Sequence, residues 1–142
     1  MSVYADSSFI VSSCIRDVHT HEVAVRMAAK PQVWLTPFGR AEVANAIHRY
    51  VFRGAISVAD ANSAWRHFEQ DRMRGIWTPT GLPEGVWESS IRLALRFGPT
   101  LGVRTLDSLH IACALELNAH KFWTFDERQA KLAEAVGLDT NP

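Results

Sequence analysis

The sequence predicts an α/β fold in which helices cover both faces of a mostly parallel sheet, giving a three-layer α/β/α sandwich. Short β-prone stretches alternate with amphipathic helical stretches along the 142 residues, a pattern typical of parallel strands joined by helical crossovers. The composition, 47% hydrophobic and 21% charged, is that of a globular chain with a sizeable core. We therefore expect one domain over residues 1–142, built on four or five short strands.

The first half of the chain predicts two strands and four helices. Thr36 followed by Pro37 suits an N-cap and a first helical position. Ser57 and Asp60 have the spacing of a capping box, with Asp in place of Glu or Gln. The expected strands cover residues 2–5 and 33–36, and the expected helices cover 7–15, 20–30, 38–54 and a stretch from Ser57 to Met73.

The second half predicts two further strands and three helices. A strand over 75–79 precedes an amphipathic helix over 84–98 and a largely apolar helix over 105–117. A fourth strand over 120–125 leads into a final helix over 126–137, which Gly137 ends. Residues 138–142 are a candidate edge strand.

Charge and cysteine usage restrict the class of protein. Lys plus Arg and Asp plus Glu both number 15, which argues against a large basic surface but leaves room for a local basic groove. Asp6 interrupts the N-terminus before a signal-peptide core can form, and no apolar run reaches the roughly 20 residues of a membrane span. Cys14 and Cys113 lack a CxxC spacing and are expected to be small buried side chains. We expect a cytoplasmic protein that does not enter a membrane.

Four acidic residues are expected at one edge of the sheet. Asp6 directly follows the first strand and Asp126 the fourth, and ligands bind outside the carboxyl ends of parallel strands. Asp107 opens the apolar helix that is expected to begin at the same edge. Glu42 flanks the apolar stripe of the helix after the second strand, so it can face inward.

Each of these acidic residues also has a simpler interpretation. Asp6 and Asp126 could be helix N-caps, Asp107 could complement a helix dipole, and Glu42 could be a solvated surface residue. Four carboxylates at one edge would repel each other unless a cation neutralised them. An oxygen-only ligand set favours Mg²⁺ or Mn²⁺, which indicates phosphodiester cleavage. Ser8 could hold a carboxylate or a bound water, or form a local backbone hydrogen bond.

Four sequence blocks resemble the motifs of the PIN domain, in particular those of the VapC-type toxin nucleases of toxin–antitoxin pairs. The blocks are "VYADSSFIV", "RAEVANAI", "TLDSLHIACALELNA" and "FWTFDERQAKLAEAVGL", and they occur in family order over nearly the whole chain. The resemblance implies a PIN-like fold and an Mg²⁺- or Mn²⁺-dependent endoribonuclease that cleaves single-stranded RNA. It places the catalytic and metal-ligating residues at Asp6, Glu42, Asp107 and Asp126. It also implies a homodimer and a VapB-like antitoxin that covers the active site.

Two other functions remain open at this stage. One is a phosphotransferase with Asp6 as the nucleophile, although the second Asp that haloacid-dehalogenase-like enzymes usually carry two positions later is Ser8 here. The other is a non-catalytic module whose acidic edge docks a basic partner.

Histidines and arginines near the motifs are secondary candidates. His110, one turn after Asp107, is interpreted as a core histidine, with a role beside the site or toward substrate as the alternative. His19 and His21 are expected at the surface. Arg49 and Arg53 lie four residues apart on the helix that carries Glu42, and either could contact RNA phosphates or be a solvated charge.

Overall fold

A computed structural model describes residues 1–142 and contains a four-stranded sheet in the order β3-β2-β1-β4. Every pairing is parallel: β1 lies between β2 and β4, and β3 pairs with the outer side of β2. The strands are β1 (Ser2–Ala5), β2 (Gln32–Leu35), β3 (Trp77–Pro79) and β4 (Lys121–Trp123). The prediction of a mostly parallel sheet of four or five short strands is confirmed.

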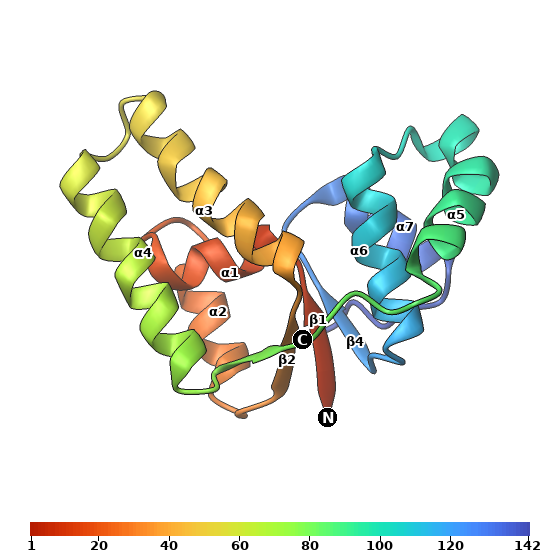
Figure 1. The fold of residues 1–142 in the computed structure, drawn as a ribbon, viewed down its shortest axis with the longest axis horizontal. Helices are drawn as coiled ribbons and strands as arrows, with labels where there is room; N and C mark the ends of the chain where they lie inside the picture. Colours follow the sequence, from red (N-terminus) through yellow and green to blue (C-terminus); the bar gives the residue numbers. More distant parts are fainter.

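Seven helices cover the two faces of this sheet, and Figure 1 shows it nearly edge-on between them. The helices α1–α4 lie on one side and α5–α7 on the other, so the three-layer arrangement is also as predicted. Their bounds are α1 (Ser7–Cys14), α2 (Thr20–Met27), α3 (Pro37–Phe52), α4 (Val58–Met73), α5 (Val86–Leu101), α6 (Thr105–Glu116) and α7 (Glu127–Ala135).

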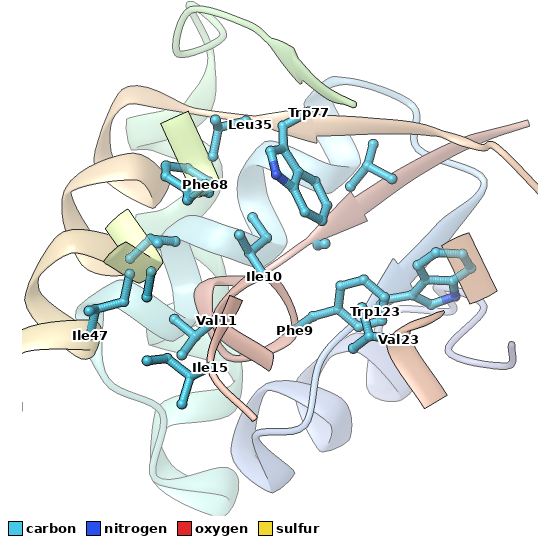
Figure 2. Packing of buried hydrophobic residues seen from close by; sticks show 14 of the residues in the cluster. Phe9, Ile10, Val11, Ile15, Val23, Leu35, Ile47, Phe68, Trp77 and Trp123 are labelled. Carbon is cyan, nitrogen blue, oxygen red and sulfur yellow. The ribbon is translucent and has the colours of Figure 1, made fainter. Parts of the chain in front are cut away.

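The central strand β1 contributes to two separate hydrophobic cores. Successive side chains of a strand point to opposite faces, so Val3 and Ala5 pack with α1–α4 while Tyr4 packs on the α5–α7 side. Figure 2 shows the first of these cores, in which Phe9 of α1 and Trp123 of β4 lie against each other. Both are essentially inaccessible to solvent. Burial of large aromatic side chains stabilises this junction and makes the start of α1 rigid.

Several element boundaries differ from the sequence prediction by one to three residues. Helix α5 does not end at Gly98 but continues through Pro99 to Leu101. It ends at Gly102, whose positive φ of 60° provides the left-handed C-cap. The strand expected over 120–125 stops at Trp123, and residues 138–142 form only one parallel bridge, between Asp139 and Lys121.

The order of the strands places a crevice at the carboxyl ends of β1 and β4. From β1 the chain proceeds to β2 and β3 on one side, and it returns to β4 on the other side of β1. The connections diverge at this point, and open parallel sheets bind ligands where that happens. The Asp6 amide donates to the Trp123 carbonyl oxygen (3.1 Å), so the two strand ends are joined directly.

No helix is both long and apolar enough to cross a bilayer.

Candidate active site

All four acidic residues singled out in the sequence line one pocket of about 780 Å³. A different helix positions each of them. Asp6 is the N-cap of α1 and Asp126 the N-cap of α7, while Glu42 lies on α3 and Asp107 on α6. In Figure 1 this is the region above the sheet, between α3 and α6, whose upper parts lie apart. The predicted grouping is therefore present in the fold, and the catalytic role of these residues remains a prediction.

Asp6 is a buried carboxylate without a cationic partner. It is the N-cap of α1, and its Oδ1 accepts hydrogen bonds from Ser8 Oγ (2.6 Å) and the Phe9 amide (3.2 Å). No hydrogen bond reaches Oδ2, and no Lys or Arg forms an ion pair with this residue, which is 1% exposed. Burial raises the pKa of Asp6 above 3.8, and the nearby His110 together with the hydrogen bonds from Ser8 and Phe9 offsets only part of that rise.

Asp107 is 1% exposed, like Asp6, but the Arg104 guanidinium binds both of its carboxylate oxygens. The Arg104 amide donates to Oδ2 (2.9 Å), which is the half of a capping box that the third helical residue supplies, and the guanidinium donates to both carboxylate oxygens at 3.1 and 3.3 Å. Gln129 Nε2 donates to Oδ1 at 3.3 Å. Burial opposes ionisation, but the Arg104 hydrogen bonds outweigh it and hold the pKa of Asp107 below 3.8.

The same guanidinium links Asp107 to the fourth acidic residue. Arg104 Nη2 donates to Asp126 Oδ2 at 3.3 Å. Asp126 uses its other oxygen to cap α7, accepting from the Arg128 and Gln129 amides at 2.9 and 3.1 Å. The capping interpretation of Asp126 therefore holds together with its position in the pocket, because the two roles use different oxygens.

Glu42 is bound by a histidine from the opposite layer of the sandwich. Its Oε1 accepts a hydrogen bond from His110 Nε2, and His110 Nδ1 is 2.9 Å from the Tyr4 hydroxyl. Burial holds the pKa of Tyr4 well above 10.0, so this hydroxyl keeps its proton. His110 is fully buried, as the core interpretation predicted, but both ring nitrogens are used at the site.

The donor set fits a hard divalent cation, although it is not assembled around one. All four candidate ligands are carboxylates, and Asp6 Oδ2 is a buried-residue oxygen that no protein donor satisfies. No three His, Cys, Asp or Glu side chains stand close enough together to hold a metal ion as they are. Arg104 explains part of this, since its guanidinium lies between Asp107 and Asp126.

Among the other predicted residues, His19 is a correction. It is half-buried and lines the pocket with its ring stacked on Phe125 (centroids 3.9 Å apart), whereas His21 is exposed as expected. The sequence pattern did not indicate the stacking contact, because His19 lies in a polar segment and Phe125 is distant from it in sequence. Arg49 and Arg53 line the pocket, are exposed, and form no ion pair.

From the sequence, Arg104 is interpreted only as one of several cations near the acidic motifs that could contact RNA, and Gln129 only as a capping-box partner of Asp126; their side-chain contacts with Asp107 are not predicted. The signal for Arg104 was its position three residues before Asp107, which is the capping-box spacing. The signal for Gln129 was its position three residues after Asp126, where its amide meets the capping carboxylate. In both cases the second contact, made by the side chain across helices, depends on the tertiary fold.

Comparisons with known proteins agree with this architecture. The structure is similar to that of Mycobacterium tuberculosis VapC20, described as a Sarcin-Ricin loop cleaving toxin, with a TM-score of 0.71 at 14% identity over 96% of this chain and 95% of that one. It is also similar to FitAcB from Neisseria gonorrhoeae, with a TM-score of 0.73 at 15% identity over 99% of this chain and 97% of that one. No curated protein sequence matches. The sequence model of the PIN domain matches residues 3–135, and the chain belongs to the PIN domain family.

Proposed function

We propose that this chain is a metal-dependent endoribonuclease that cleaves single-stranded RNA and acts as the toxin of a toxin–antitoxin pair. The observation that carries the proposal is the meeting of four carboxylates from four helices in one pocket at the carboxyl edge of a parallel sheet. Membership of the PIN domain family supports a nuclease, and the similarity to VapC20, a toxin that cleaves an RNA loop, supports RNA as the substrate.

Asp6, Glu42, Asp107 and Asp126 would hold the Mg²⁺ or Mn²⁺ ion in this proposal. Such an ion, when bound, polarises a phosphoryl group and lowers the pKa of a water that attacks phosphorus. The caps at Asp6 and Asp126 keep one oxygen of each carboxylate engaged and leave the other for the pocket.

Arginines around the pocket would bind the RNA backbone. Arg49 and Arg53 are one helical turn apart on α3, exposed and unpaired, so their guanidinium groups are available to phosphates. Arg104, the N-cap of α6, also lines the pocket, but its guanidinium already binds Asp107 and Asp126. Arg40 is a weaker candidate for the same reason, because Glu69 binds it at 2.6 Å. Arg49 and Arg53 thus supply local positive charge beside an acidic pocket, which a zero net charge allows.

Protein partners are part of the same proposal: a VapB-like antitoxin that covers the active site, and a second copy of the chain in a homodimer. Helix α5 supports a protein contact because Trp87, Ile91 and Leu95 are 56%, 50% and 75% exposed and lie on one face at four-residue intervals. An RNA substrate places the activity in the cytoplasm, with no role for a membrane. Sedimentation of the purified chain would measure its oligomeric state.

The decisive experiment compares carboxylate variants for RNA cleavage with Mg²⁺ or Mn²⁺. We expect Asp6→Asn and Asp107→Asn each to lower the cleavage rate by more than about 100-fold, beyond the 10- to 100-fold typical of partners that only support a metal ligand. Glu127→Gln is the matched control, since Glu127 is exposed and adjacent to Asp126, and it should cleave normally. Undiminished cleavage by both Asn variants would exclude the carboxylate mechanism, and a stable acyl phosphate on Asp6 would favour a phosphotransferase.

A further inference from the structure

A buried hydrogen-bonded chain connects the central strand to the acidic pocket. It runs from Tyr4 of β1 to His110 of α6 and then to Glu42 of α3, so it joins three elements that are far apart in sequence. Tyr4 and His110 are at most 1% exposed, while the Glu42 side chain is 23% exposed and reaches the pocket. Only the last member of this chain can therefore meet a ligand.

The chemistry of the hydrogen bonds identifies the donor at the Glu42 end of this hydrogen-bonded chain. A carboxylate only accepts, so His110 Nε2 carries the proton that it donates to Glu42 Oε1. The Tyr4 hydroxyl lies 2.9 Å from Nδ1, where it donates to a neutral ring and accepts from a protonated one. Phe38 packs against the same imidazole, with ring centroids 4.6 Å apart. With both nitrogens engaged and its ring enclosed, His110 has no free atom for a metal ion or for RNA.

Glu42 requires such a partner because of its place on α3. The three aspartates of the site lie at helix starts, where free backbone amides fix them: the Phe9 amide for Asp6, the Arg104 amide for Asp107, and two α7 amides for Asp126. Glu42 lies inside a helix, where every nearby amide is already used, and its side chain is longer and more flexible. The donor that fixes it has to come from another element.

We propose that His110, held in place by Tyr4, is a positioning residue that fixes Oε1 of Glu42 and leaves Oε2 for a divalent cation in the pocket. No protein hydrogen bond reaches Glu42 Oε2. This inference rests on the proposed function for the presence of the cation. It concerns only how the carboxylate is held, and His110 acts through Glu42 alone.

The test measures Mn²⁺ binding by titration calorimetry on the full chain, without RNA. His110→Leu removes the donor and should weaken Mn²⁺ binding by about 10- to 100-fold, the range for partners that orient metal ligands. His110→Gln retains an N–H donor and should recover most of that loss. Tyr4→Phe removes only a hydroxyl and should weaken binding by about 2- to 10-fold, as expected for one hydrogen bond. Equal weakening by the Gln and Leu variants overturns the proposal. If the Leu variant does not fold, unchanged Mn²⁺ binding in Tyr4→Phe overturns it.

A double-mutant cycle separates positioning from a purely structural role. In a Glu42→Gln background, Tyr4→Phe should no longer change Mn²⁺ affinity, because the carboxylate through which it acts is gone. The same fold-change in both backgrounds overturns the proposal. A wild-type chain that binds no Mn²⁺ also overturns it. A wild-type chain that binds Mn²⁺ and shows the cycle but cleaves no RNA contradicts the proposed function and leaves the positioning role supported.

Discussion

Asp6 and Asp107 are both 1% exposed, yet the pKa of Asp6 is raised and the pKa of Asp107 is lowered. Burial acts against the charged form of both, and it acts more strongly on Asp6, which lies deeper among protein atoms. In addition, Asp107 receives three hydrogen bonds from Arg104, while Asp6 receives two from uncharged donors. Depth in the protein and the nearest cation together therefore set the charge of these two carboxylates.

This difference divides the pocket into two halves. The half formed by Asp107 and Asp126 carries its own cation, since Arg104 lies between them. The half formed by Asp6 has none, and a cation from solution would complete it. The Asp6 half should therefore respond strongly to added metal and to pH above 4, and the Asp107 half should respond to the loss of Arg104.

The largest expected effect is stabilisation of the wild-type chain by Mn²⁺. A ligand that binds only the folded state at 100 times its dissociation constant raises the free energy of unfolding by about 2.7 kcal/mol. Asp6→Asn should remove most of this increase, because it removes the carboxylate that has no cation of its own. Thermal unfolding with and without Mn²⁺ measures the change, with Glu127→Gln as the control. An undiminished Mn²⁺ effect in Asp6→Asn would refute the special role of the Asp6 half.

The next effect is a difference in sign between two substitutions in the metal-free chain at pH 7. Asp6→Asn replaces a buried charge that lacks a partner and should raise the free energy of unfolding by about 1–3 kcal/mol. Asp107→Asn removes the negative charge and one of the two oxygens that Arg104 binds, and should lower the free energy of unfolding by about 1 kcal/mol. Denaturant unfolding with EDTA present measures both. If both variants are destabilised, the neighbours of Asp6 compensate its charge better than its contacts indicate.

Much of this pocket could be predicted from the sequence because strand ends are local features. Asp6 and Asp126 directly follow β1 and β4, and parallel strands bring such residues to one edge wherever the sheet forms. The N-cap interpretations were also local, and the structure confirms them for Asp6 and Asp126. The capping interpretation does not exclude the functional one, since capping uses only one oxygen of each of these two aspartates.

Contacts between elements could not be predicted in the same way. The partner of His110 is 68 positions away on α3, and its second partner is 106 positions away on β1. The stacking of His19 on Phe125 also joins distant segments, which is why His19 was wrongly expected at the surface. Pattern and spacing describe single helices and strands, whereas these contacts arise only when the layers pack.

The free energy of unfolding should depend on pH through the Asp6 half and the Asp107 half of the pocket in two separate pH ranges. The folded-state pKa of Asp6 is raised, so its contribution to stability is fully present below the unfolded pKa near 3.8 and is lost as pH rises through the folded value. The folded-state pKa of Asp107 is lowered, so its contribution is present above 3.8 and is lost as pH falls through the folded value. In each pH range the free energy of unfolding should change by at most about 1.4 kcal/mol per pH unit from that residue. In metal-free denaturation series, Asp6→Asn should flatten only the upper range and Asp107→Asn only the lower; the opposite pattern would show that the two assignments are reversed.

The smallest effect on stability is expected from Arg104→Gln. The Arg104 side chain is 59% exposed and its partner Asp107 is 1% exposed. The backbone amide of residue 104 and the Gln129 side chain still donate to Asp107 in this variant, so the free energy of unfolding should fall by only about 0.5–1 kcal/mol. Mn²⁺ binding should nevertheless become tighter, because the guanidinium no longer competes for Asp107 and Asp126. Arg128→Gln is the matched control, since Arg128 is exposed beside Asp126 without an ion pair, and removes the same charge from the neighbourhood. If calorimetry gives the same Mn²⁺ affinity for both variants, Arg104 acts only through its long-range charge; tighter binding in Arg104→Gln alone would show that its guanidinium occupies the position a metal ion takes between the two aspartates.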